Sequence, residues 1–386
     1  MKIIHILPHN LEDFASADPH SFDHHSVRFI EKVGRFWKIE HPLEALEQEL
    51  WMLTKKYNTD ISVMHTSGFR VRLFPISIKL PLPLEISFPM MQALFKERRE
   101  TAFYHLHGYY LFMHDFLSFI LKIHKKKYAI HFRGGGPSWT FKATAYTLYH
   151  YIIGLRFSLN MASLVVIQNK DEVRRATNIL WVSPKKILYF PNTVPLESIL
   201  SSPAKHTIAR IVLAGRLDEK LRSTEELLLV FRNTLTNFQE CTIHFIGGKS
   251  GPVIETLKGE FPGRTFTTGW LQKKDLWKEY GNSDIYIHTN TKPEGSPAAL
   301  IEAQSQGAAV IAFDVEGVRD MVHNGKDGIL VKNYPELEQQ LLNVLIDQKL
   351  RISLREGALI NAREHFTDEK YFPQLIKIYS HLSAQS

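Results

Sequence analysis

Cysteine is nearly absent from this sequence of 386 residues, which contains only Cys241. A single cysteine excludes internal disulfides and paired-cysteine zinc or redox sites, and it is typical of the reducing cytoplasm, where we expect the protein to reside. Long apolar runs are also absent: none reaches the about 18 uncharged residues that a membrane-spanning helix needs. Residues 2–7 lack the long apolar segment and cleavage site of a signal peptide, so we expect them to form a buried strand.

Acidic residues are scarce between positions 51 and 190. Residues 1–190 contain 25 Lys and Arg against 16 Asp and Glu, and residues 51–190 alone contain 20 against 7. Residues 191–386 contain 22 against 24 and are nearly neutral. The net charge of +13 over 51–190 indicates an anionic partner for the first half, with a solvated basic surface as the alternative.

Short apolar runs alternate with amphipathic segments of helix length throughout the chain. This alternation is typical of βα units around parallel sheets and predicts an α/β fold. The expected strands are 2–7, 61–66, 103–107, 128–132, 163–168, 186–191, 209–215, 241–247, 285–289, 308–313 and 328–332. Segment 68–100 has four prolines and no clear period, so we expect it to be irregular.

A stretch rich in proline and serine divides the chain at 191–206. We therefore expect a first domain over 1–190, a linker over 191–206, a second domain over 207–365 and a C-terminal helix over 366–386.

The most informative segment is PEGSPAALIEAQSQGAAVIAFDVEGVRD, residues 293–320. Its pattern predicts a loop, a short helix and a strand. Ser296 can cap the helix, Pro297 suits its first position, and Gly307 can end it in a left-handed conformation. The N–H groups at such a helix start, around 295–299, form a site for an anion.

Two carboxylates accompany this helix start. Glu294 precedes the helix and can reach a ligand at its mouth, while Glu302 follows eight residues later within the helix. Vicinal sugar hydroxyls are natural partners for the two oxygens of a carboxylate. Two solvated carboxylates would also fit this spacing, but the glycine, proline, helix and strand around them favour a ligand site.

In this context Glu294-x7-Glu302, followed by Gly317 and Asp320, resembles the signature of the family-4 retaining glycosyltransferases of GT-B fold, also known as glycosyl transferases group 1. The resemblance implies two Rossmann-like domains that face each other across a cleft, with a C-terminal helix crossing back to the first domain. It also implies that Glu302 binds the ribose hydroxyls of a nucleotide.

The same resemblance implies that Glu294 holds the donor sugar together with the backbone of Gly295, Ser296 and Pro297. A second motif, VLAGRLDEKLRSTEELLLVF (212–231), is similar to the family's diphosphate-binding element.

Arg216 matches the arginine of this element. The family's lysine corresponds either to Lys220 or to Arg222, and the helix register favours Arg222. These cations would stabilise the negative charge that develops on a leaving diphosphate.

A third segment, 267–290, resembles the region of the family that holds the nucleotide base. It places Gly269, Trp270 and Leu271 at the base, although a buried core tryptophan explains Trp270 equally well.

The first half resembles the family less closely. FYHLHGYY (103–110) is similar to a VHxHG segment, which implies a substrate contact for His107. YAIHFRGGGP (128–137) places Arg133 where the family has an active-site histidine. Gly134 begins a triple glycine whose N–H groups could approach a phosphate, and a plain flexible loop is the alternative.

No metal and no cofactor are expected, because the resemblance implies a reaction that generally needs no catalytic metal. His20, His24 and His25 have helix-like spacing, but among 19 histidines chance clustering is the favoured explanation.

The sequence thus predicts a retaining glycosyltransferase of hexosyltransferase type. It would move a sugar from a nucleotide-sugar, bound by the second domain, to a hydroxyl of a glycan or lipid-linked glycan, bound by the first. The alternatives are a sugar-nucleotide epimerase or hydrolase of the same fold and a non-catalytic nucleotide-sugar-binding protein. We expect no nucleic-acid partner because no such motif is present. An anionic membrane surface is the favoured partner of the basic half, which would make the enzyme peripheral on the inner membrane face.

Overall fold

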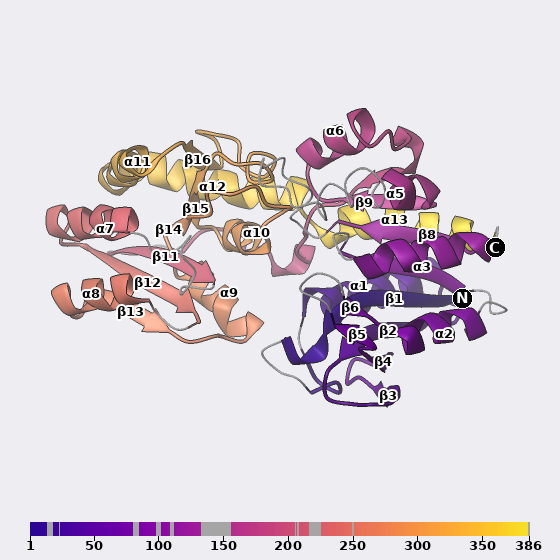
Figure 1. Ribbon diagram of the computed structural model, residues 1–386. Helices are drawn as coiled ribbons and strands as arrows, with labels where there is room; N and C mark the ends of the chain where they lie inside the picture. Colours follow the sequence, from indigo (N-terminus) through magenta and orange to yellow (C-terminus); the bar gives the residue numbers. More distant parts are fainter. Residues whose placement is uncertain are drawn as a thin grey trace. The chain divides into compact units, whose positions relative to one another are not determined.

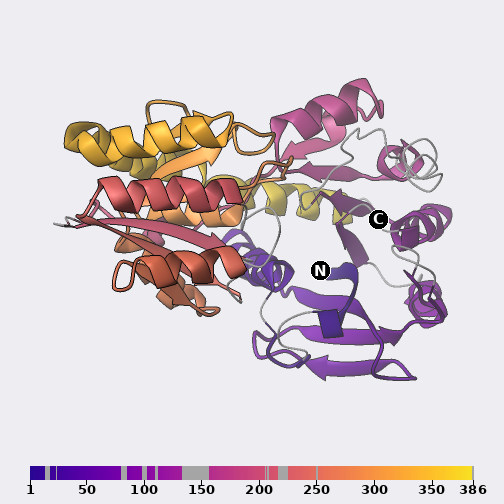
Figure 2. The same ribbon diagram turned by 60° about the vertical axis from the view of Figure 1, so that its left-hand side comes forward.

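The computed structural model describes residues 1–13, 18–22, 24–79, 85–97, 102–108, 112–132, 156–204, 206, 208–215, 225–248 and 251–384. The chain divides into two compact units, shown in Figure 1 and Figure 2. Unit 1 comprises Met1–Phe190 and Lys370–Ser386, and unit 2 comprises Pro191–Glu369. Residues 191–206, expected to be a linker, therefore group with unit 2.

Unit 1 contains an eight-stranded sheet with the strand order β10-β9-β8-β7-β1-β2-β4-β3. Its strands are β1 (Lys2–Asn10), β2 (Glu47–Thr54), β3 (Ile61–Met64), β4 (Arg70–Pro75), β7 (Ala102–His107), β8 (Tyr128–His131), β9 (Leu164–Ile167) and β10 (Ile187–Tyr189). Neighbouring strands are parallel except β3, which is antiparallel to β4. A separate antiparallel pair is formed by β5 (Ile78–Lys79) and β6 (Glu85–Ile86).

Helices cover both faces of this sheet (Figure 1). One face packs against α1 (His25–Glu40) and α13 (Asp368–Ala384), whose Phe36 and Phe372 rings stack at 5.3 Å. The other face packs against α2 (Phe88–Lys96), α3 (Phe112–Ile123), α5 (Arg156–Met161) and α6 (Lys170–Asn178). Because both faces are covered, β7, β8 and β9 are wholly buried, as is usual for parallel strands.

Unit 2 contains a six-stranded parallel sheet with the order β13-β12-β11-β14-β15-β16. Its strands are β11 (Ala209–Gly215), β12 (Cys241–Gly247), β13 (Thr265–Thr268), β14 (Ile285–His288), β15 (Ala309–Phe313) and β16 (Gly328–Val331). Its helices are α7 (Glu225–Asn237), α8 (Pro252–Glu260), α9 (Lys273–Gly281), α10 (Ala298–Ser305), α11 (Tyr334–Ile346) and α12 (Gln348–His365).

The alternation of side chains along these strands explains why unit 2 has two apolar layers. On β11, Ile211 and Leu213 pack toward α7, α8 and α11, whereas Val212 and Ala214 pack toward α9 and α10. A buried ion pair ties α12 to the sheet, because Arg355 Nη1 donates to Asp284 Oδ1 at 2.6 Å. Burial lowers the pKa of Arg355, and the neighbouring Asp284 carboxylate opposes that shift.

The expectation of irregular structure over 68–100 is wrong. This segment contains β4, the β5–β6 pair and α2. The strand β2, which pairs with β4, was not expected as a strand either. The reason is that charges occupy inward or half-buried positions of these strands. Glu49 on β2 is only 1% exposed, and Arg70 and Arg72 alternate with the buried Val71 and Leu73 on β4.

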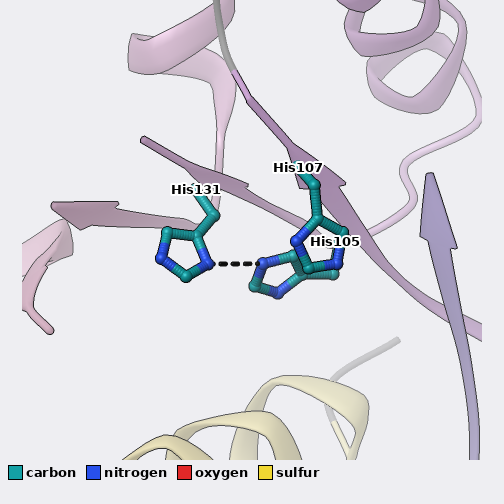
Figure 3. Close-up of side chains that lie close together, drawn as sticks. All are labelled: His105, His107 and His131. Carbon is teal, nitrogen blue, oxygen red and sulfur yellow. Dashed lines mark hydrogen bonds between the residues drawn. The ribbon is translucent and has the colours of Figure 1, made fainter. Parts of the chain in front are cut away.

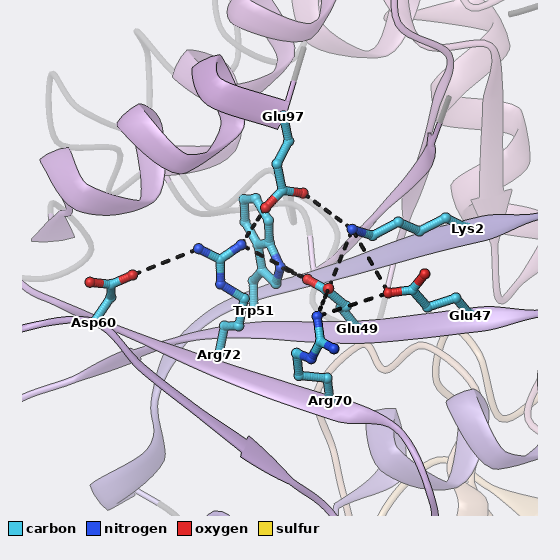
Figure 4. Close-up of polar contacts among 8 residues, drawn as sticks. All are labelled: Lys2, Glu47, Glu49, Trp51, Asp60, Arg70, Arg72 and Glu97. Atoms are coloured by element: carbon cyan, nitrogen blue, oxygen red, sulfur yellow. Dashed lines mark hydrogen bonds and ion pairs between the residues drawn. The ribbon is translucent and has the colours of Figure 1, made fainter. Parts of the chain in front are cut away.

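An ion cluster satisfies these charges (Figure 4). The Glu49 carboxylate accepts hydrogen bonds from Trp51 Nε1 at 2.8 Å and from Arg70 Nη1 at 3.1 Å, and Lys2 Nζ lies 3.3 Å from it. Burial by itself raises the pKa of Glu49, but the Trp51 N–H and the Lys2 ammonium outweigh burial and hold that pKa below its ordinary value. Glu97, which pairs with Arg72, has its pKa raised by burial.

We therefore expect Glu49→Gln to lower the free energy of unfolding at pH 7 by about 1–3 kcal/mol, because a buried charged hydrogen-bond acceptor is lost. A group with a lowered pKa stabilises the fold above its ordinary pKa, and this contribution disappears as the pH falls through the folded-state value. The deficit of the variant should therefore shrink in acid. Urea unfolding followed by circular dichroism at pH 7 and pH 4 measures it.

The matched control is Glu47→Gln, on the same strand, whose side chain is 55% exposed. We expect it to change stability little, since exposed ion pairs contribute at most about 1 kcal/mol. A deficit for Glu49→Gln that is equal at both pH values would contradict the assignment.

Candidate functional site

The carboxyl ends of β11 and β12 approach each other unusually closely. Gly215 and Gly247 pair at the end of these strands, and a Cβ atom on Gly247 would lie 1.8 Å from the Gly215 carbonyl oxygen. The next residue, Gly248, donates its N–H to the same oxygen at 3.3 Å. In an open α/β sheet, ligands bind at the carboxyl ends of the strands. Because these three residues are glycines, a ligand at this edge would contact backbone rather than side chains.

Trp270 follows the neighbouring strand β13 and stands beside this glycine edge. Its indole Nε1 lies 3.4 Å from the position that a Cβ on Gly248 would take. The residue is 65% exposed, so the alternative of a buried core tryptophan is wrong. Gly269 has open space around it, and Leu271 is half-buried against the α9–α10 side of the core. An exposed aromatic at the ligand edge offers a surface on which a planar base can stack.

The carboxylate of Glu294 is held by a buried histidine. His288, the last residue of β14, lies with its Nε2 2.5 Å from Glu294 Oε1, and its Nδ1 is 3.3 Å from the Tyr286 hydroxyl. Because an ionised carboxylate only accepts hydrogen bonds, an ionised Glu294 accepts the N–H at His288 Nε2. His288 is buried, whereas the Glu294 side chain is 17% exposed. The pair thus orients one carboxylate oxygen and keeps Glu294 at the protein surface.

A glycine behind Glu294 is sterically required. Gly317 has φ +86°, and a Cβ there would lie 2.4 Å from the carbonyl oxygens of both Glu294 and Gly295. Glu294 also donates its backbone N–H to the Glu316 carbonyl at 3.0 Å. The loop after β15 therefore packs directly on the backbone that carries the Glu294 side chain.

The start of α10 differs in detail from the expectation. Pro297 is the N-cap residue and Ala298 the first helical residue, so Ser296 does not cap the helix. The Ser296 hydroxyl instead accepts the backbone N–H of Asn192 at 3.0 Å, and the Asn192 side chain donates to the Ser296 carbonyl. The Ser296 hydroxyl is therefore bonded to a residue far upstream in the chain and does not cap α10.

The rest of α10 follows the expected pattern. Gly307 ends it with φ +75° and donates its N–H to the Gln304 carbonyl at 3.0 Å, which confirms the predicted left-handed termination. Glu302 lies in the middle of the helix and is 9% exposed. This burial contradicts the alternative of a solvated carboxylate for Glu302.

Several predicted site residues lie outside the described residues: Arg133, Gly134, Arg216, Lys220 and Arg222. Their roles stay predictions from the resemblance. His107 is described and fully buried in unit 1, where its Nε2 lies 3.1 Å from His5 Nδ1. The substrate contact expected for His107 stays a prediction from the resemblance.

Sequence reasoning missed His288, Tyr286 and Asn192. A usable signal existed for His288, since a histidine at the carboxyl end of a buried parallel strand lies at the ligand edge of the sheet. No local signal links Asn192 to Ser296, which are 104 residues apart.

The sequence profile of the family described as "Glycosyl transferases group 1" matches residues 200–360. An uncharacterized glycosyltransferase of Methanocaldococcus jannaschii is 28% identical over 180 residues, covering 45% of each chain. The N,N'-diacetylbacillosaminyl-diphospho-undecaprenol alpha-1,3-N-acetylgalactosaminyltransferase of Campylobacter jejuni is 31% identical over 110 residues, covering 28% of each. The chain therefore matches less than half the length of these relatives.

Two solved structures resemble the whole chain. Sucrose-phosphate synthase from Thermosynechococcus elongatus has a TM-score of 0.73 at 16% identity and covers 100% of both chains. Anabaena HepE in complex with UDP has a TM-score of 0.71 at 14% identity and covers 99% of this chain and 100% of that one. At these identities the likeness establishes the fold, which is GT-B with two Rossmann-like units. This fold and the match over residues 200–360 together support a group 1 glycosyl transferase of GT-B fold.

Proposed function

We propose that the protein is a retaining glycosyltransferase that moves a hexosyl group from a nucleoside diphosphate sugar to an acceptor hydroxyl. The observation that carries this proposal is the arrangement around α10. Glu294 and Glu302 belong to one loop–helix segment at the carboxyl edge of the unit 2 sheet, and His288 and Gly317 hold Glu294 in place. A family match over the same residues supports it.

Each acidic residue has a distinct role in the proposal. Glu294 accepts hydrogen bonds from hydroxyls of the donor sugar, and Glu302 from the ribose hydroxyls of the nucleotide. The glycine edge formed by Gly215, Gly247 and Gly248 lets backbone approach the nucleotide, with Trp270 beside its base. Arg216 and Arg222, or Lys220 in its place, bind the diphosphate as the family resemblance predicts.

The proposed reaction is a displacement on one face of the sugar. The bond between the anomeric carbon and the diphosphate oxygen breaks, and the acceptor oxygen bonds to the same carbon from the same face. The acceptor proton passes to the leaving diphosphate oxygen, so the step needs no protein nucleophile. The basic side chains at the diphosphate stabilise the charge that develops there.

One relative supports a proposal for the chemical class of the acceptor. The name of the Campylobacter jejuni relative describes transfer onto an undecaprenyl diphosphate-linked sugar. We propose a lipid-linked glycan as the acceptor of this chain as well. Release of free sugar with every acceptor would instead identify a hydrolase, and nucleotide-sugar binding without turnover a binding protein.

We expect Glu294→Gln to lose most turnover with nucleotide affinity nearly unchanged, because this carboxylate serves the sugar. Glu302→Ala should instead weaken nucleotide binding by about 1–3 kcal/mol, the cost of a lost charged hydrogen bond. The nucleotide to use is the one among UDP, GDP and ADP that raises the thermal midpoint of the wild type. Calorimetry then measures its binding, and release of this nucleotide from its sugar measures turnover. Wild-type turnover in Glu294→Gln would overturn the role of Glu294.

A glycine pair tests the position of Glu294. Gly317→Ala and Gly325→Ala both place alanine at a positive φ, of +86° and +78°, which costs about 1–2 kcal/mol of stability in each. Only the Cβ at 317 meets backbone, since a Cβ at Gly325 has nothing within 4 Å. We expect Gly317→Ala to lose turnover on the order of 100-fold, because a misplacement of about 1 Å has that effect, and Gly325→Ala to keep it.

Circular dichroism and thermal midpoints verify that both glycine variants fold. Equal turnover in two folded variants would show that the contact at Gly317 does not position Glu294.

A lipid-linked acceptor requires access to a membrane, and unit 1 offers a suitable surface. None of the helices in the described ranges is long and apolar enough to cross a membrane. The helix α2 meets the end of α3, where the ring centroids of Phe95 and of His124, the residue after α3, are 5.0 Å apart. Their exposed side chains, here called the α2/α3 surface, are Phe88, Phe95, Lys96, Phe116, Phe119, Lys122, Ile123 and Lys125.

The composition of the α2/α3 surface fits binding to an anionic bilayer. Phe116, Phe119 and Ile123 follow a helical spacing and are 38–59% exposed, so they form an apolar stripe. Lysines flank the stripe, and burial together with the Lys122 and Lys127 ammonium groups lowers the pKa of Lys186. Apolar side chains beside lysines are suited to the boundary between acyl chains and anionic headgroups.

We expect the protein to sediment with vesicles containing phosphatidylglycerol and to be released by salt. Lys122→Glu combined with Lys125→Glu should weaken binding at least about tenfold, since each basic residue contributes about 1 kcal/mol near an anionic surface. The control is Arg35→Glu with Lys38→Glu, two exposed basic residues of α1, which covers the other face of the unit 1 sheet. Absence of binding at low salt, or equal loss in both variants, would overturn this surface.

A further inference from the structure

Three histidine side chains meet in the interior of unit 1, whereas the residues assigned to the donor belong to unit 2. His105 and His107 are two residues apart on β7, so they lie on the same face of the strand. His131, the last residue of β8, pairs with His107 in the parallel register. One ring nitrogen of each histidine lies within 4.8 Å of those of the other two, and Figure 3 shows the three rings facing one another.

The three rings are buried, and one phenylalanine contacts all of them. His105 and His107 are 0% exposed and His131 is 1% exposed. The Phe29 ring lies 5.1–5.4 Å from each of the three imidazoles, between ring centroids. Neutral imidazole, with a lone pair on one nitrogen, is the form that binds metal ions.

A chain of hydrogen bonds determines which nitrogen of His107 carries its proton. Gln48 Nε2 donates to the Ile30 carbonyl at 3.2 Å, which turns Gln48 Oε1 toward His5 Nε2 at 3.3 Å. His5 therefore carries its proton on Nε2 and accepts at Nδ1 from His107 Nε2, 3.1 Å away. Neutral His107 then has its lone pair on Nδ1.

The other two histidines already have the spacing of metal ligands. His105 Nε2 lies 3.2 Å from His131 Nδ1. Zinc–nitrogen bonds of about 2.0–2.1 Å in a tetrahedral site separate two ligand nitrogens by about 3.3 Å. The Tyr379 hydroxyl meets His105 Nδ1 and can accept its proton, which is the outer contact that a metal-binding histidine usually makes.

We propose that His105, His107 and His131 bind one transition-metal ion of the zinc class. Three imidazole nitrogens suit Zn²⁺, Co²⁺, Ni²⁺ or Cu²⁺ and disfavour Mg²⁺ and Ca²⁺, which prefer oxygen ligands. Three protein ligands leave a fourth position for water or a small anion.

The ion has a structural role in this proposal. It joins β7 to β8 and, through the Tyr379 contact with His105, attaches the C-terminal helix α13 to the sheet. No step of the proposed sugar transfer uses a metal ion, so the ion is given a structural role alone. The proposal therefore does not depend on the proposed function.

The test uses the full chain without a polyhistidine tag, stripped with a chelator and then titrated with Co²⁺ or Mg²⁺. We expect one Co²⁺ per chain, the visible absorption of a four-coordinate cobalt site, and a thermal midpoint that rises with Co²⁺ and Zn²⁺ but not with Mg²⁺. X-ray absorption of the zinc form should show three imidazole nitrogens at about 2.0–2.1 Å. This measurement identifies the ligands in the wild type, so it does not rely on a variant that folds.

His131→Gln should abolish stoichiometric cobalt binding, while His381→Gln, which changes an exposed histidine of α13, should bind as the wild type does. Cobalt affinity should also fall below about pH 6.5, where protons compete for imidazole. A folded wild type that binds neither Co²⁺ nor Zn²⁺ would show a hydrogen-bonded cluster without metal and overturn the proposal. Binding retained in a folded His131→Gln, or a spectrum without three imidazoles, would overturn it as well.

Discussion

The backbone contact between Gly317 and the Glu294–Gly295 peptide is the constraint on which the candidate donor site depends. No side chain fits between these segments, because a Cβ on Gly317 would lie 2.4 Å from two carbonyl oxygens. The loop after β15 can therefore close on the loop before α10, and Glu294 is brought to the end of β14. There His288 meets its carboxylate. Without this close approach, neither the orientation of Glu294 nor the path of the chain into α10 would be defined.

The same segment is supported from the point where the chain enters unit 2. Asn192 bonds to Ser296, one residue after Gly295, and two residues later Val194 forms a bridge with Thr367, just before the chain leaves the unit. Thr193 Oγ1 donates to Asp368 Oδ1 at 2.6 Å across this bridge. The two crossing segments are thus bonded to each other and to the start of α10. Residues 191–206 are consequently an integral part of unit 2 and not a free tether.

Unit 1 uses polar side chains in its interior, and this is why its sequence was harder to interpret. Glu49 on β2 is surrounded by Lys2, Arg70 and Trp51, so a buried position carries a charge and the apolar alternation of a strand is interrupted. Histidines on β7 and β8 likewise occupy core positions. Binary patterns assign polar residues to the surface, and they fail where a cluster of partners satisfies the charge or the ring nitrogens inside.

The sequence alone determined the α/β class, nearly all strands of unit 2, and the loop–helix segment with Glu294 and Glu302. These features depend on local alternation, on helix caps and on glycine, whose effects extend over a few residues. Only the tertiary structure decided that His288 binds Glu294, that Ser296 serves Asn192 rather than α10, and that His107 is buried beside His105 and His131. Such contacts join residues on different strands or loops. They arise from strand order and register, which a local pattern does not encode.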